Sequence, residues 1–176
     1  MSRGLFIGRF QPFHKGHYNA IKDILKVEDE VIICVAASQF SYSISNPFSC
    51  GERIEMILRS VRDIRDKVIV LSSPNIENNS LWVENIIDSF PSFDKVYTNN
   101  TLVRLLWEKR DYKVSQFNFY QKEEYNGTII RNLISQGKNW GDLVPVETKK
   151  YIKEINGEKR IKEILKIEDK LREGAL

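Results

Sequence analysis

Short apolar runs alternate with segments of helical periodicity along most of the chain. In the segments between the runs, apolar residues recur every three or four positions, which predicts one helix after each strand. Strands separated by single helices are typical of βαβ units, and near-continuous apolar strands fit a parallel sheet covered on both faces. The pattern therefore predicts a doubly wound α/β fold of Rossmann-like type, with about five parallel strands. The predicted strands are 4–8, 30–36, 68–71, 95–97 and, more weakly, 113–117.

The second half of the chain changes character, because from Thr128 onward the pattern is helical throughout. Earlier in the chain, Ser49 and Glu52 have the spacing of a capping box and precede a helical period. Nine Gly and five Pro are scattered, so no linker or repeat divides the sequence. We expect a single domain over 1–176, with an α/β core in 1–120 and a mainly helical segment in 121–176.

Composition narrows the classes of partner. The 176 residues include 27 Lys and Arg against 24 Asp and Glu, a net charge of +3, which does not imply a nucleic-acid or anionic-membrane partner. The lysine- and arginine-rich segment 149–172 is interleaved with acidic residues, as a solvated helix face is. Cys34 and Cys50 cannot form a disulfide framework, and Cys34 lies in an apolar run that predicts burial. With no apolar stretch of membrane-spanning length and no signal-peptide pattern, a cytoplasmic location is expected.

The densest chemical signal follows the first predicted strand, where ligands of open α/β sheets bind. The segment Gly-Arg-Phe-Gln-Pro-Phe-His-Lys-Gly-His covers residues 8–17 and contains both histidines of the chain, His14 and His17. A metal pair lacks a third histidine or a suitably spaced cysteine. Capping of the following helix is a second interpretation. We favour a third, anion binding, because a helix N-terminus would stand beside two imidazoles, Arg9 and Lys15. Glycine-rich dinucleotide and phosphate loops of the usual form are absent.

These residues carry a family resemblance. His14-Lys15-Gly16-His17 matches the His-x-Gly-His signature of the nucleotidylyltransferase superfamily, and the ten-residue string 8–17 resembles the nicotinamide-nucleotide adenylyltransferases of archaeal type. Further stretches are similar to that family and extend the resemblance over nearly the whole chain: 47–53, 79–83, 125–131 and 155–160.

The resemblance implies a reaction in which nicotinamide mononucleotide (NMN) and ATP give NAD and pyrophosphate. The NMN phosphate is already ionised near neutral pH, so it can attack the α-phosphorus of ATP in line without a general base. Catalysis then consists of positioning and electrostatic stabilisation. Mg²⁺ is expected to arrive with ATP, and no metal site made by the protein is expected. The resemblance also implies a homo-oligomer, a hexamer in most of the family.

The implied site has two parts. His14 and His17 would donate hydrogen bonds to the ATP phosphates, and Arg131 would hold the β- and γ-phosphates as a bidentate donor. The catalytic set is His14, His17, Arg131 and Arg9. The expected ATP-binding set also includes Gly8, Phe10, Gly127 and Thr128. The expected NMN-binding set is Trp82, Asn79 and the backbone near Ile76.

For several of these residues, a purely structural role is an alternative to the functional one. Arg131 has the spacing of an exposed helix cation, and Trp82 has the spacing of a core residue. Trp107 and Trp140 have no motif support and are expected to be structural. Tyr120 and Tyr125 are likewise expected to be structural, although both are close enough to Thr128 to line an adenine pocket.

Three positions depart from the family pattern. Asn126 replaces a serine before Gly-Thr, Asn99 and Asn100 stand within a segment that usually reads Ser-Gly-Asn-Pro, and Ser45 replaces a basic residue. The choice between NMN and nicotinate mononucleotide stays open. Rival hypotheses are an adenylyl- or cytidylyltransferase acting on phosphopantetheine or FMN, a ligand-sensing module, and a nucleic-acid-binding protein.

Overall fold

The computed structural model describes residues 1–117 and 125–173, and the side chains of 1–117 and 125–171. Its centre is a sheet of five parallel strands in the order β3-β2-β1-β4-β5. The chain moves outward from β1 to one edge and then returns to the other side of β1, which places the topological switch point between β1 and β4. The strands are β1 (Arg3–Gly8), β2 (Glu30–Ala36), β3 (Val68–Ser73), β4 (Lys95–Tyr97) and β5 (Lys113–Ser115).

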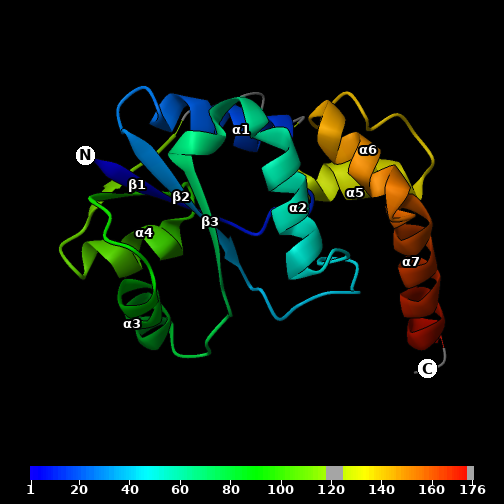
Figure 1. Cartoon of the computed structure of the whole chain (residues 1–176). Helices are drawn as coiled ribbons and strands as arrows, with labels where there is room; N and C mark the ends of the chain where they lie inside the picture. Colours follow the sequence, from blue (N-terminus) through cyan, green and yellow to red (C-terminus); the bar gives the residue numbers. More distant parts are fainter. Residues whose placement is uncertain (118–124, 174–176) are drawn as a thin grey trace.

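Helices cover both faces of this sheet (Figure 1). Each strand up to β4 is followed by a helix, as the periodicity predicts. From residue 125 onward, the described part of the chain is mainly helical. The helices are α1 (Lys15–Ile24), α2 (Cys50–Ser60), the short 3₁₀ helix η1 (Arg62–Lys67), α3 (Asn79–Ser89), α4 (Thr101–Glu108), α5 (Gly127–Ser135), α6 (Val146–Glu154) and α7 (Gly157–Glu173).

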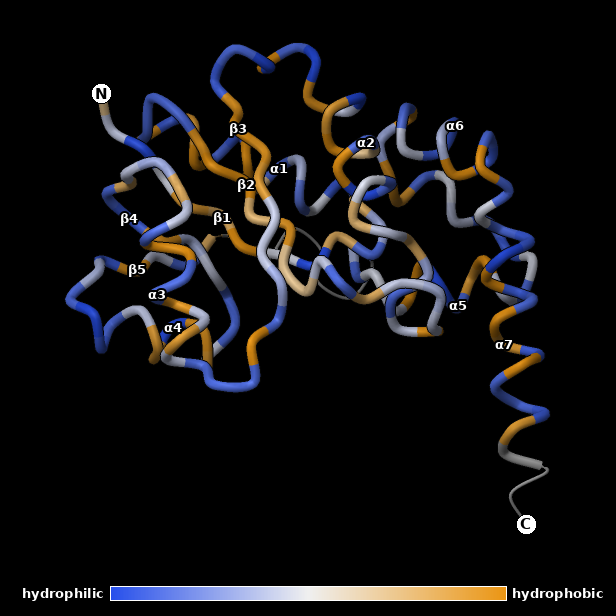
Figure 2. The backbone as a smooth tube through the Cα atoms, turned by 60° about the horizontal axis from the view of Figure 1, so that its bottom comes forward, coloured by the Kyte–Doolittle hydropathy of each residue, from blue (hydrophilic) through white to orange (hydrophobic). Residues whose placement is uncertain are grey.

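Alternation along the strands builds two hydrophobic clusters. In β2, Val31, Ile33 and Val35 join the cluster that α1, α2, α5 and α6 cover. Ile32 and Cys34 point the other way, into the cluster that α3 and α4 cover. All five of these β2 side chains are fully buried. The strands β1, β2 and β3 are mainly orange in Figure 2 because most of their residues are apolar. The prediction of a doubly wound parallel sheet is confirmed, as is the burial of Cys34.

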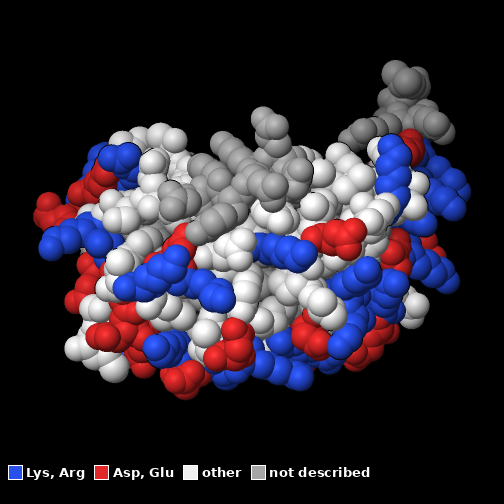
Figure 3. All heavy atoms as spheres, turned by 90° about the horizontal axis from the view of Figure 1, so that it is seen from above, with Lys and Arg blue, Asp and Glu red and all other residues white. Residues whose placement is uncertain are grey.

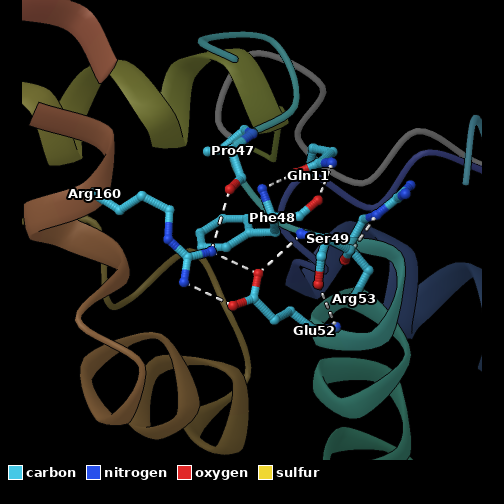
Figure 4. Close-up of polar contacts among 7 residues, drawn as sticks. All are labelled: Gln11, Pro47, Phe48, Ser49, Glu52, Arg53 and Arg160. Carbon is cyan, nitrogen blue, oxygen red and sulfur yellow. Dashed lines mark hydrogen bonds and ion pairs between the residues drawn. The ribbon is translucent and has the colours of Figure 1, made fainter. Parts of the chain in front are cut away.

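The helical C-terminal segment is fastened to the first half of the chain by polar contacts (Figure 4). The Arg160 guanidinium of α7 donates to both carboxylate oxygens of Glu52 in α2, at 2.6 and 2.7 Å, and to the Pro47 carbonyl at 3.3 Å. Farther along α7, Glu168 accepts a hydrogen bond of 2.9 Å from the Ile44 backbone N–H. Because the Arg160 and Glu52 side chains are only 17% and 15% exposed, this ion pair is screened less than a surface pair.

Surface charge and helix hydrophobicity concern nucleic-acid and membrane partners. Lys and Arg side chains alternate with Asp and Glu over the face seen in Figure 3. Among the described residues, no helix is both long enough and apolar enough to cross a membrane.

Candidate active site

Two cavities lie at the carboxyl ends of the strands, on either side of Arg9. The first, of about 200 Å³, is lined mainly by the turn after β1 and the start of α5. The second, of about 340 Å³, lies over the ends of β1, β2 and β4 at the switch point. Arg9 lines both and is exposed, so its guanidinium can serve an anion shared between the two cavities. The first cavity is lined by Arg9, Phe10, Gln11, His14, His17, Asn126, Gly127, Thr128 and Arg131.

The two histidines cap the first helix through each other. The His14 Nδ1 accepts from the His17 backbone N–H at 3.3 Å, and the His17 Nδ1 accepts from the His14 backbone N–H at 3.2 Å. Their rings stack with centroids 3.5 Å apart. A neutral imidazole has one N–H, and Nδ1 is an acceptor in both rings, so both protons belong on Nε2. Capping and anion binding are therefore compatible: the cap sets the tautomer that leaves each Nε2–H free of the cap, on two residues that line the first cavity.

Aromatic side chains enclose these rings and keep them neutral. The His17 ring lies 4.7 Å from the Phe10 ring and 5.6 Å from the Phe13 ring, centroid to centroid. His14 is 7% exposed. Burial lowers the pKa of His14 to about 3, and burial together with the neighbouring His14 lowers the pKa of His17 well below its usual value.

Acidification is expected to destabilise the free protein through these histidines. Since the unfolded chain binds protons near pH 6.5 and folded His14 only near pH 3, stability is full above about pH 6.5 and is lost as pH falls between these values. For His14 alone, the free energy of unfolding should drop by about 2 kcal/mol from pH 7 to pH 5. Denaturant unfolding at the two pH values measures it.

The control for that experiment is His14→Asn, because asparagine still offers an oxygen for the cap and does not titrate. The variant should lose about 2 kcal/mol less than the wild type over the same pH interval. An equal loss in both proteins would contradict the role of His14.

The start of α5 brings the second group of donors to the first cavity. Asn126 is the N-cap, and its Oδ1 accepts from the Thr128 backbone N–H at 2.8 Å. The Arg131 guanidinium donates from Nη1 to the Gln11 carbonyl at 2.7 Å and from Nη2 to the Thr128 hydroxyl at 3.2 Å. Burial, and then the like charge of Arg9, lower the pKa of Arg131 to about 10, so it stays charged at neutral pH. Asn126, a departure from the family pattern, thus retains the capping function of a serine.

Two glycines allow the elements around the first cavity to approach closely. A Cβ on Gly127 would lie 2.8 Å from the Gln11 carbonyl oxygen, so any side chain would push α5 away from the turn after β1. A Cβ on Gly16 would lie 2.9 Å from the Cβ of Tyr125 and 3.1 Å from the His14 ring. Both glycines of the two signature motifs are therefore required by contact between distant parts of the chain.

The second cavity has a different character. Trp82 forms part of its wall and is 7% exposed, so it is at once a core residue and a cavity residue. Asn79, at the start of α3, lies in the same wall. Gly8 lines this cavity and not the first one. The full lining is Ile7, Gly8, Arg9, Ala36, Ala37, Asn75, Asn79, Trp82, Thr98, Asn100, Leu102, Val103 and Leu106.

Other predicted site residues are placed elsewhere. The Ile76 side chain packs against the hydrophobic cluster under α3 and α4, while its neighbour Asn75 lines the second cavity, so the prediction for the backbone near Ile76 stays a prediction. Trp107 and Trp140 are buried, as expected. Tyr125 lies beside Gly16 and is not among the residues that line the first cavity, whereas Tyr120 falls outside the described residues.

The remaining departures have local structural roles. The Asn99 side chain exchanges two hydrogen bonds with the Phe117 backbone, at 3.0 and 3.2 Å. Asn100 caps α4 by accepting from the Val103 N–H at 3.0 Å. Ser45 is exposed, and its hydroxyl accepts from the Asn46 amide at 3.1 Å. Among the described residues, the cations that line the cavities are Arg9, which lines both, and Arg131, which lines the first.

Sequence reasoning missed Gln11 as a member of the site. Its side-chain amide pairs with the Phe48 backbone, donating to the carbonyl at 2.8 Å and accepting from the N–H at 3.0 Å (Figure 4). Its own backbone carbonyl accepts from Arg131. Gln11 therefore connects the loop before α2 to a cavity arginine, a connection between segments that no local pattern indicates.

Arg53 was also missed, although the sequence carries a signal. Arg53, Met56 and Ile57 have the i, i+3, i+4 spacing of one helix face, and all three are fully buried. The Ser49 capping box sets the start of this helix and so predicts which face is buried. An arginine on the apolar face of a predicted helix is rare and indicates a buried polar role.

Among the described residues, no group of three or more His, Cys, Asp or Glu side chains could hold a metal ion. The described residues that line the first cavity include no carboxylate.

Comparison with known proteins agrees with this geometry. The model of the Cytidylyltransferase-like family matches residues 5–133. A nicotinamide-nucleotide adenylyltransferase of Saccharolobus solfataricus is 43% identical over 168 residues, covering 94% of this chain and 98% of that protein. One of Archaeoglobus fulgidus is 42% identical over 168 residues, covering 92% of this chain and 97% of that protein.

A solved structure shares the fold. The bifunctional NMN adenylyltransferase/ADP ribose pyrophosphatase of Francisella tularensis, complexed with AMP and a manganese ion, aligns with a TM-score of 0.77 at 19% identity. The alignment covers 98% of this chain and 54% of that one, so this chain spans about half the length of the Francisella protein. With full-length relatives above 40% identity and both signature motifs in one cavity, this chain belongs to the Cytidylyltransferase-like family and, within it, to the nicotinamide-nucleotide adenylyltransferases.

Proposed function

We propose that this protein transfers the adenylyl group of ATP to NMN, forming NAD and pyrophosphate. The observation that carries the proposal is the pairing of a cationic cavity with an apolar one that contains a tryptophan, joined by Arg9. ATP phosphates suit the first cavity, and the nicotinamide ring suits the second. The phosphate of NMN then stands beside Arg9, facing the α-phosphorus.

The chain's own groups supply donors and no proton transfer. The Nε2–H groups of His14 and His17 donate to the α-phosphate, where negative charge develops in the transition state. Arg131 and the Thr128 N-terminal turn hold the β- and γ-phosphates, and the pyrophosphate leaves with its charge stabilised by them. Since both histidines are neutral, they act by hydrogen bonding.

Mg²⁺ enters with ATP as part of the substrate. ATP phosphate oxygens and water are the hard oxygen ligands that such an ion prefers. The prediction of a homo-oligomer, a hexamer by resemblance, and the prediction of a cytoplasmic location stay predictions.

Trp82 is proposed to stack on the cationic nicotinamide ring. Trp82→Leu should raise the KM for NMN by about tenfold, because stacking and cation–π attraction contribute about 1–2 kcal/mol. The KM for ATP should change by less than about twofold on this reasoning. Initial rates at varied NMN and at varied ATP measure both constants.

Trp107→Phe is the matched control, since Trp107 packs against Trp82 with ring centroids 6.5 Å apart and lines neither cavity. It should lower the melting temperature and leave the KM for NMN unchanged. If both substitutions raise this KM equally, loosened packing explains the effect and Trp82 does not bind the ring.

The experiment that tests the proposed function is a coupled assay of the purified protein with ATP, Mg²⁺ and NMN, following NAD. Nicotinate mononucleotide, phosphopantetheine and FMN are run beside NMN as alternative acceptors. NAD formation with NMN supports the proposal, and turnover with only another acceptor would replace NMN by that acceptor. Binding of ATP without turnover of any acceptor would favour a sensing role.

A further inference from the structure

Arg53 is a buried cation that pairs with backbone alone. It is fully buried in α2, and no ion pair of the described residues includes it. All its hydrogen bonds go to main-chain carbonyls. Nη1 donates to Ala36 and Arg9, Nη2 to Ala37 and Nε to Ser49, at 2.8, 2.9, 3.2 and 3.3 Å respectively.

Three of these carbonyls belong to the walls of the second cavity. Arg9, Ala36 and Ala37 all line it, and they follow the carboxyl ends of β1 and β2. One planar guanidinium thus connects the two turns that enclose the cavity at the switch point. Its fixed donor directions set the distance between them, which a flexible single ammonium would not do.

Both turns contain strained backbone that needs such support. Ala37 has a φ of 52° and Phe10, directly after Arg9, has a φ of 53°, the left-handed region that disfavours side chains. Conformations of this kind cost about 1 kcal/mol or more each and persist where surrounding contacts enforce them. The hydrogen bonds of Arg53 are contacts of that kind: one goes to Arg9 in the turn after β1, and two go to Ala36 and Ala37 at the end of β2.

A purely structural role explains this arrangement poorly. A buried, unpaired cation costs free energy, and an apolar side chain of similar volume packs as well without that cost. Arg9 stands near with a like charge, and none of the described residues that line the two cavities is a carboxylate that could offset the pair. A role in shaping the second cavity explains the charge and the planar guanidinium of Arg53 better than a role in core packing does.

We infer that Arg53 is a positioning residue for the acceptor site: it holds the Arg9 backbone and the turn after β2, so that the Arg9 guanidinium stands between the two cavities and receives the acceptor phosphate. The inference rests on the proposed function. It predicts that Arg53 acts through Arg9, and energetic coupling between the two residues tests that statement.

The experiment is a double-mutant cycle of Arg53→Lys and Arg9→Ala in the coupled NAD assay. We expect kcat/KM for NMN to fall about tenfold in Arg53→Lys and about 100-fold in Arg9→Ala, and no more than about 100-fold in the double variant. Independent effects would multiply to about 1,000-fold, and that result overturns the inference. Ile57→Val, a buried change in the same helix outside both cavities, controls for lost packing and should leave kcat/KM unchanged.

Folding failure is covered by a second variant. If Arg53→Lys does not fold, Arg53→Gln, which keeps an amide donor without the charge, takes its place in the cycle; if neither folds, Arg53 serves the fold alone and the inference is wrong. A wild type that makes no NAD overturns the proposed function instead. In that case the shift in melting temperature caused by NMN is measured for the same four proteins. Non-additive effects of the Arg53 and Arg9 substitutions on this shift support the role of Arg53, and additive effects contradict it.

Discussion

Replacing His17 by alanine is expected to lower kcat for adenylyl transfer by about 100- to 1,000-fold, the usual cost of removing one transition-state donor. The structure aligns both Nε2–H groups through the reciprocal cap, so loss of His17 also frees the His14 backbone N–H and loosens the ring stack. Steady-state rates with saturating ATP and NMN measure kcat. The KM for ATP should change much less than kcat, because the interaction strengthens as charge develops on the α-phosphate.

His17→Asn separates the cap from the chemistry. The asparagine oxygen can accept from the His14 N–H in place of Nδ1, but no donor then stands where Nε2–H was. Its melting temperature should lie near that of the wild type while its kcat is as low as that of His17→Ala. If His17→Asn keeps wild-type kcat, His17 is a capping residue and its catalytic assignment is wrong.

Arg131→Ala should lower kcat/KM for ATP by about 100-fold or more, because a charged two-pronged donor to the β- and γ-phosphates is lost. Arg131→Lys should recover only part of this, since a single ammonium cannot reproduce the fork that also reaches the Gln11 carbonyl. Initial rates at varied ATP provide kcat/KM, and a thermal melt reports the lost contact between α5 and the turn after β1.

Lys138→Ala is the matched control for charge. Lys138 is an exposed cation just beyond α5 and lines neither cavity, so its loss should leave kcat/KM for ATP within about twofold, as expected for a screened surface charge. Equal effects of the two substitutions would mean that net charge alone attracts ATP. If the Arg131→Ala protein is stable and fully active, Arg131 does not bind the ATP phosphates, and its role is only to connect α5 to the turn after β1.

Strand number, order of elements and the location of the site were predictable because each depends on local patterns. Apolar runs and helical periods define the βαβ units, and the carboxyl ends of such strands are where ligands bind. Residues 8–17 were singled out because both histidines fall in one turn after a strand. The dual character of Trp82 was also visible, because helical spacing and motif pointed to different roles for the same residue.

What the sequence by itself determined, then, is the α/β class, the turn that carries the histidines and the motif that begins α5. The tertiary structure alone decided that the Gln11 carbonyl accepts a hydrogen bond from Arg131 and that Arg53 holds the turns after β1 and β2. It also decided that Gly8 lines the second cavity and that the Ile76 side chain does not. The physical reason is range. Periodicity and capping act within a few residues, whereas these contacts join segments up to 120 residues apart, and only packing brings their donors and acceptors together.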